Sequence, residues 1–162
     1  MHLGGVYLDT DVWVLRPLMP LMRNELSMGY EDSGRLTNAF MVSRPWCPFL
    51  LLWYSMYYDF SPGEWAEHSV ALPGHIARVC PRWVHTEERS LMRPSYFETN
   101  ILYDEHSAFT FENNMVVHLW NHRVRVDLTV CWVLTHGSPV ARLARQELLT
   151  EPFFRAFNFT CN

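Results

Sequence analysis

Two aspartates, Asp9 and Asp11, stand one residue apart in the apolar stretch GGVYLDTDVWVL (4–15). Apolar and β-branched residues dominate this stretch, which predicts one β-strand. Alternation places both aspartates on the face that also carries Tyr7 and Trp13, and both faces are mainly apolar, as in a strand covered on both sides. Two like charges at this spacing repel, and burying them unpaired is costly. A divalent ion would resolve both problems, and oxygen ligands suit Mg²⁺ or Mn²⁺. The alternative is that both aspartates lie on a solvated face.

Composition narrows the functions that remain open. The chain has 162 residues, 49% of them hydrophobic and 15% aromatic, which is enough for one domain with a core. Its formal net charge of −4 argues against a nucleic-acid partner. All thirteen basic residues are arginine, so the chain contains no Walker-type phosphate loop and no lysine nucleophile.

The cysteines at positions 47, 80, 131 and 161 form no Cys-x-x-Cys motif, which disfavours a zinc ribbon. Their spacing fits either one or two disulfides or buried thiols, and we leave these alternatives open. Asn158-Phe159-Thr160 matches the N-glycosylation acceptor pattern. The cysteines and this acceptor favour the secretory pathway.

The remaining pattern predicts a single mixed α/β domain over residues 1–162. We expect a loop at 29–36. Residues 80–112 are expected to be irregular, with short strands around 95–103. A helix at 66–79 is expected to be interrupted by the LPG segment at 72–74. Strands are predicted at 37–43 and 114–121, and helices at 48–58 and 138–149. The helix at 48–58 is apolar and is expected to be buried, and it is too short to span a bilayer. The helix at 138–149 should be capped by Ser138, with Pro139 at its first position.

Three segments resemble, in the same order, a glycosyltransferase family whose sugar-binding region contains an Asp-x-Asp motif. This family includes α-1,4-galactosyltransferases and α-1,4-N-acetylglucosaminyltransferases. The segments are GGVYLDTDVWVL (4–15), NAFMVSRPWCPFL (38–50) and VVHLWN (116–121). They cover much of the chain, and the first and last are the most specific.

The resemblance implies a partial GT-A fold, of the nucleotide-diphospho-sugar transferase type, that begins at the Asp-x-Asp strand. In that fold a Mn²⁺ or Mg²⁺ ion bridges the two phosphates of the donor. Asp9 would face the donor ribose and sugar, and the metal ligands would be Asp9, Asp11 and His118. The resemblance places three further residues beside the donor: Asn38, Trp120 and Asn121. The residues by themselves allow blander roles, with His118 and Trp120 in the core and Asn38 capping a turn.

The chain also departs from the family pattern. In the family, the segment that matches LPGHIARV (72–79) contacts the donor sugar or the acceptor. This chain keeps Pro73 and Arg78 of that segment but differs from the family pattern at Leu72, Gly74 and Ala77. The family places nucleotide-binding strands before the Gly-Gly pair, where this chain has three residues. The resemblance therefore implies a C-terminal metal and acceptor half, with the N-terminal nucleotide-binding part and its membrane anchor absent. We expect such a half, alone, to transfer sugar at background level.

The leading hypothesis is a metal-dependent glycosyltransferase, and members of the family that the chain resembles retain the anomeric configuration. It would move a sugar from a UDP-sugar donor to a glycan or glycolipid acceptor. The sequence assigns no nucleophile or general base. We expect the full-length protein in the Golgi lumen as a type II membrane protein. The second hypothesis is a non-catalytic fragment or pseudoenzyme with residual sugar or metal binding. A phosphatase of the haloacid dehalogenase type ranks far lower, because Trp13 stands where Thr or Val is required and no lysine exists.

Overall fold

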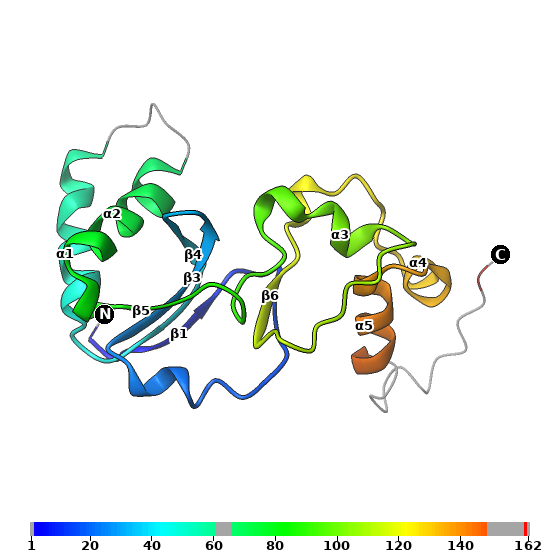
Figure 1. The fold of residues 1–162 in the computed structure, drawn as a ribbon, viewed down its shortest axis with the longest axis horizontal. Coiled ribbons are helices and arrows are strands. Elements are labelled where there is room, and N and C mark those ends of the chain that lie inside the picture. The colour runs from blue at the N-terminus through cyan, green and yellow to red at the C-terminus, as the bar shows by residue number, and fades with distance from the viewer. Residues whose placement is uncertain (1, 61–65, 149–160, 162) are drawn as a thin grey trace. The chain divides into compact units, whose positions relative to one another are not determined.

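The computed structural model describes residues 2–60, 66–148 and 161, and the chain divides into two compact units (Figure 1). The first unit comprises Met1–Tyr96 and Asn113–His118, and the second comprises Phe97–Glu112 and Leu119–Asn162. The described residues form a mixed α/β structure, which confirms the predicted class. The expectation of a single domain stays a prediction.

A four-stranded mixed sheet is the centre of the first unit, with the strand order β1-β4-β3-β5. Strand β4 pairs antiparallel with both β1 and β3, whereas β5 pairs parallel with β3. Strands β2 and β6 form a separate antiparallel pair. The strands are β1 Gly5–Leu8, β2 Val12–Val14, β3 Leu26–Asp32, β4 Arg35–Ser43, β5 His85–Glu87 and β6 Val116–His118.

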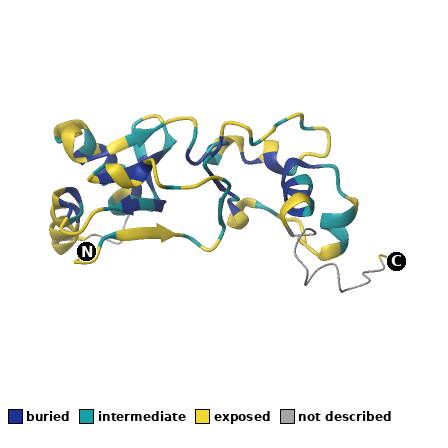
Figure 2. Cartoon of the chain, turned by 90° about the horizontal axis from the view of Figure 1, so that it is seen from below, coloured by how far each residue is buried: buried dark blue, intermediate teal, exposed yellow. Residues whose placement is uncertain are grey.

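The prediction of one continuous strand over residues 4–15 is wrong. Strand β1 ends at Leu8, β2 begins at Val12, and the two strands belong to different sheets. The break is a turn, in which the Val12 N–H donates to the Asp9 carbonyl at 3.2 Å. Aspartate favours such turns because its short polar side chain tolerates them. The expected cover on both faces is also wrong for β1, whose four residues are exposed and appear so in Figure 2.

The loop predicted at 29–36 is instead the hairpin that joins β3 to β4. Asp32 pairs with Arg35 across a two-residue turn, in which Gly34 has φ +85°. Arg35 also donates to both Asp32 carboxylate oxygens, which satisfies polar groups that made this segment resemble a loop. Gly29 suits the strand because a Cβ there would lie 2.6 Å from the Met92 side chain.

Two helices pack against the sheet of the first unit through one shared core cluster, α1 at Pro48–Met56 and α2 at Leu72–Val79. Helix α1 confirms the predicted helix and its first-turn proline. The expectation that it is buried is wrong, because only Phe49 and Trp53 of its residues are buried. The predicted interruption at 72–74 is also wrong, because a π-helical segment at Glu67–Ala71 continues directly into α2. The LPG segment marks the change from π-helical to α-helical hydrogen bonding, and Pro73 lies in the first turn of α2.

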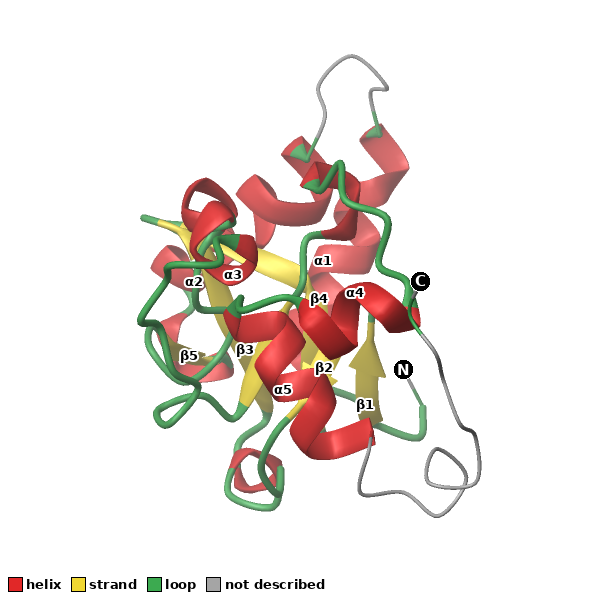
Figure 3. Ribbon diagram, turned by 90° about the vertical axis from the view of Figure 1, so that its right-hand side faces the viewer, coloured by secondary structure: helices red, strands yellow, loops and turns green. Residues whose placement is uncertain are grey.

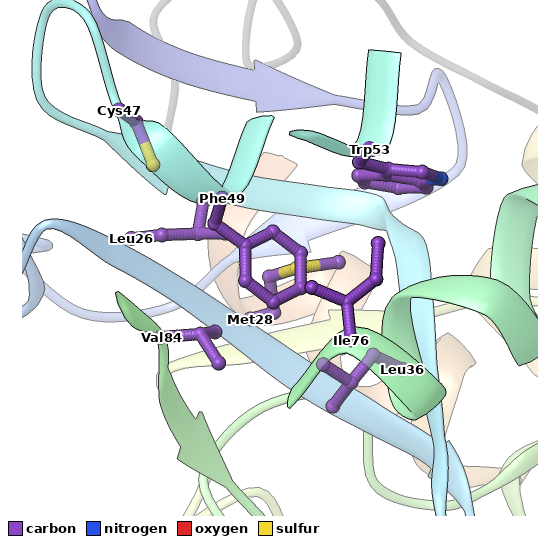
Figure 4. Close-up of a cluster of buried hydrophobic side chains, with 8 residues drawn as sticks. All are labelled: Leu26, Met28, Leu36, Cys47, Phe49, Trp53, Ile76 and Val84. Atoms are coloured by element: carbon purple, nitrogen blue, oxygen red, sulfur yellow. The ribbon is translucent and has the colours of Figure 1, made fainter. Parts of the chain in front are cut away.

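The core of the first unit lies on both faces of the β3–β4 hairpin. One cluster joins the sheet to both helices, and Figure 4 shows the Phe49 ring among Leu26, Met28 and Ile76. A second cluster of buried residues is formed by Leu21, Ala39, Phe40, Val42, Leu91, Met92 and Val116. Residues of β3 and β4 are thus buried in the first cluster, and residues of β4 in the second.

The second unit is built from short helices: α3 Asn100–Tyr103, α4 Val130–Thr135 and α5 Pro139–Leu148. Helices α4 and α5 lie beside one another (Figure 3). Helix α5 confirms its prediction, since the Ser138 hydroxyl accepts from the Ala141 N–H at 3.4 Å. The short strands expected around 95–103 are wrong, because this segment forms a 3-10 turn and α3.

The structure distinguishes between the disulfide and thiol alternatives for the four cysteines. Cys131 and Cys161 form a disulfide, whereas Cys47 is a buried thiol and Cys80 a half-buried one. The acceptor Asn158 lies outside the described residues. Among the residues that are described, no helix has both the length and the apolar character needed to cross a bilayer.

Candidate metal centre

The turn between β1 and β2 holds the two aspartates. The Asp9 N–H donates to the carbonyl of Ala39 in β4 at 2.8 Å, which fixes the start of the turn against the sheet. The Val12 N–H then donates back to the Asp9 carbonyl. Both carboxylates are half-buried, and the short turn keeps them close together.

His118 reaches this turn from β6. The register of the β2–β6 pair sets His118 opposite Val12, the residue that follows Asp11. Nε2 of His118 lies 3.1 Å from Oδ1 of Asp11, and the imidazole is buried with 6% of the residue exposed. The predicted strand at 114–121 is therefore confirmed in kind but is only three residues long.

Asp9, Asp11 and His118 form a possible metal-binding group. One ligand atom from each residue lies within 4.8 Å of the other two. Two carboxylates and one imidazole offer oxygen and nitrogen atoms, a set that fits Mg²⁺ or Mn²⁺. Two carboxylates brought together repel one another, and a bound cation would remove this repulsion. The grouping of these three predicted ligands is confirmed, whereas the ion that they bind stays a prediction.

Tyr7 holds the first carboxylate from the side of β1. Its hydroxyl donates to Oδ1 of Asp9 at 2.7 Å. This hydrogen bond, together with burial and the negative charge of Asp9, raises the pKa of Tyr7 above its usual value. The phenol therefore stays protonated and continues to donate at neutral pH. The sequence analysis placed Tyr7 on the same strand face as Asp9 but gave it no role. The separation of two residues between Tyr7 and Asp9 was the feature that could have indicated their contact.

The three predicted donor-binding residues are placed differently. Asn38 lies inside β4, next to the Ala39 carbonyl that holds Asp9, so it does not cap a turn. Trp120 and Asn121 belong to the second unit. Trp120 is buried and has φ 54°. It is the N-cap of the 3-10 turn Asn121–Arg123. A donor-binding role stays a prediction for all three residues.

Comparison with known proteins shows similarity to part of a curated fungal protein. The chain is 32% identical over 136 residues to glucan organizing enzyme 1 of Cryptococcus neoformans var. grubii serotype A. The match covers 72% of this chain and 36% of that protein, so the chain spans about a third of the length of its relative. No family model matches the chain, and no solved structure matches it significantly.

Proposed function

We propose that this chain is the metal-binding and acceptor part of a metal-dependent glycosyltransferase. It would take part in moving a sugar from a UDP-sugar to a hydroxyl of a glycan or glycolipid, and its first unit would belong to a GT-A fold. The observation that carries the proposal is the convergence of Asp9, Asp11 and His118 on one point. The name of the Cryptococcus relative, which refers to glucan, supports a role in carbohydrate chemistry.

The roles of the residues follow from their contacts. Asp9 and Asp11 would supply the negative charge that holds a divalent cation, and His118 would contribute a ring nitrogen from the buried end of β6. When bound, such a cation would neutralise charge on a departing diphosphate. Tyr7 fixes the direction of the Asp9 carboxylate. Asn38, beside the same turn, is the candidate contact to the donor sugar. No nucleophile or base is assigned.

The setting of the full-length protein belongs to the same proposal. The Cys131–Cys161 disulfide supports an oxidising compartment, because disulfides persist mainly in the secretory pathway. We propose that the full-length protein resides in the Golgi lumen.

Manganese binding provides the test. The free Mn²⁺ signal in electron paramagnetic resonance should fall when protein is added, and UDP should strengthen binding by adding phosphate ligands. Asp11→Asn should weaken Mn²⁺ binding by about tenfold or more, since even supporting residues of metal sites contribute that much. Asp127→Asn, at an exposed position in the second unit, is the matched control. Equal Mn²⁺ binding by both variants would overturn the metal assignment.

A non-catalytic role is the second candidate, because no nucleophile or base is assigned among the described residues. Such a protein would bind Mn²⁺ and UDP but would not transfer sugar. A radiolabelled UDP-sugar assay, run on this chain and on a longer protein that contains it, separates the two. Chelator-sensitive transfer by the longer protein supports the enzyme.

A further inference from the structure

The hydrogen-bond ladder between β1 and β4 ends at Asp9, the first member of the candidate metal-binding group. The register pairs Leu8 with Phe40, so the next pair in line is Asp9 with Ala39. One bond of that pair is present, because the Asp9 N–H donates to the Ala39 carbonyl at 2.8 Å. In a regular antiparallel ladder the Ala39 N–H would return a bond to the Asp9 carbonyl. Here each of these two groups has a different partner, and the ladder stops.

Thr37 supplies the partner of the Ala39 N–H. The side-chain oxygen of Thr37, Oγ1, accepts this N–H at 3.1 Å. Both residues are buried, with 1% of Thr37 and 2% of Ala39 exposed, so the N–H depends on this acceptor. A threonine hydroxyl can bond a backbone N–H two residues further along the chain and thereby compete with a β-ladder. The hydroxyl thus occupies the N–H that would otherwise extend the ladder by one bond.

Strand β4 is irregular at the same place. In its pairing with β3, Met41 is the partner of Met28, and Leu36 is the partner of Tyr30. Residues 37–40 of β4 therefore lie opposite a single residue of β3. Bulges of this kind end regular pairing or redirect side chains, and they are common beside functional sites. The irregular segment of β4 contains both ends of the hydroxyl bond.

The Asp9 carbonyl is left to form the turn between β1 and β2. It accepts the Val12 N–H at 3.2 Å, and Asp11 lies within the turn that this bond closes. Strand β2 then leaves the sheet of β1 and pairs with β6. That pairing brings Nε2 of His118 to 3.1 Å from Oδ1 of Asp11. The convergence of the three candidate ligands thus depends on the Asp9 carbonyl facing Val12 rather than Ala39.

We propose that Thr37 is a positioning residue of the metal site: its hydroxyl takes the Ala39 N–H and so keeps the Asp9 carbonyl for the turn. This role rests on the proposed function, in which the turn holds a cation. Without the hydroxyl, the buried Ala39 N–H loses its acceptor, which is costly. The Asp9 carbonyl would then be drawn to this N–H, which would extend the ladder, open the turn and move Asp11 away from His118.

The first test follows the turn in metal-free protein. Thr37→Val keeps the β-branched shape and removes the acceptor, whereas Thr37→Ser keeps an acceptor. Hydrogen exchange of the Val12 amide, measured by NMR on isotope-labelled protein, reports its bond to the Asp9 carbonyl. We expect this exchange to be roughly fivefold faster in Thr37→Val, the factor that corresponds to the loss of one net hydrogen bond. In Thr37→Ser it should match the unaltered chain.

The second test measures Mn²⁺ affinity by isothermal titration. Thr37→Val should bind Mn²⁺ about tenfold more weakly, as is typical when a residue that orients metal ligands is lost. Thr37→Ser should bind as the unaltered chain does, because it retains the hydroxyl. Thr86→Val is the matched control, since it makes the same change at a half-buried position in β5 of the same sheet. It should leave both the Mn²⁺ affinity and the Val12 exchange rate unchanged.

Three results would overturn the inference. The first is an unchanged Val12 exchange rate in Thr37→Val, and the second is an unchanged Mn²⁺ affinity in that variant. The third is an equal loss of Mn²⁺ affinity in Thr37→Val and Thr37→Ser, which would assign the effect to packing rather than to the hydroxyl. Failure of the proposed function gives a different result, because the unaltered chain itself would then bind no Mn²⁺.

Discussion

At the scale of single residues, the metal group depends on a contact between two distant points of the chain. His118 and Asp11 are 107 residues apart and meet because β2 and β6 pair in a register that sets Val12 opposite His118. The two aspartates could be predicted from their spacing and charge alone. His118 could not, because an isolated histidine in an apolar strand fits a core position equally well. Its selection required the resemblance of the VVHLWN segment.

Tyr7 provides a prediction at this scale. Tyr7→Phe keeps the ring but removes the hydroxyl that donates to Asp9, so the carboxylate loses its fixed direction. We expect Mn²⁺ affinity to fall by roughly tenfold, at the low end for supporting residues, because Tyr7 is half exposed. Isothermal titration with Mn²⁺ measures the change. Tyr54→Phe is the control, since no hydrogen bond to the metal group involves its hydroxyl. Unchanged affinity in Tyr7→Phe would show that Asp9 is oriented by its backbone alone.

At the scale of elements, apolar periodicity located strands and helices better than it located turns. Strand β4 and helices α1 and α5 follow their predicted positions closely. The segment 4–15 was expected to be one strand because apolar residues stand on both sides of Asp9, so the sequence pattern does not reveal the turn there. The segment 29–36 was expected to be a loop because Asp32 and Arg35 are charged, yet they satisfy each other across the hairpin. Both differences arise where tertiary partners override local composition.

The contact between α2 and the hairpin provides a second prediction. A Cβ at Gly74 would lie 2.1 Å from the Gly34 carbonyl oxygen, and neither backbone can yield without moving its element. Gly74→Ala should therefore destabilise the chain by about 2 to 3 kcal/mol, as overpacking typically does. Urea unfolding followed by circular dichroism measures this. His75→Ala, at the exposed next position, should change the free energy of unfolding by less than about 0.5 kcal/mol. Equal stability of the two variants would contradict the close approach.

At the scale of the whole molecule, the pattern of strands and helices predicted the mixed α/β class, but the spacing of the cysteines could not choose between disulfides and thiols. That choice depends on which cysteines the fold brings together. The structure joins Cys131 of α4 to Cys161 and keeps Cys47 and Cys80 as thiols. Because disulfides form in oxidising compartments, the number of free thiols tests the proposed secretory location.

Protein made in a secretory pathway should contain two free thiols, whereas protein made in a reducing cytosol should contain four. Maleimide labelling under denaturing conditions, followed by mass spectrometry, counts them directly. The disulfide closes a loop with a sequence separation of 30 residues, so chain entropy predicts a loss of about 3 to 4 kcal/mol for Cys131→Ser. Cys80→Ser, at a half-buried thiol, is the control and should have a much smaller effect. Four thiols in secreted protein would remove the structural argument for an oxidising compartment. Two thiols, together with a thermal midpoint that falls on reduction, would show that the Cys131–Cys161 disulfide forms and stabilises the folded chain.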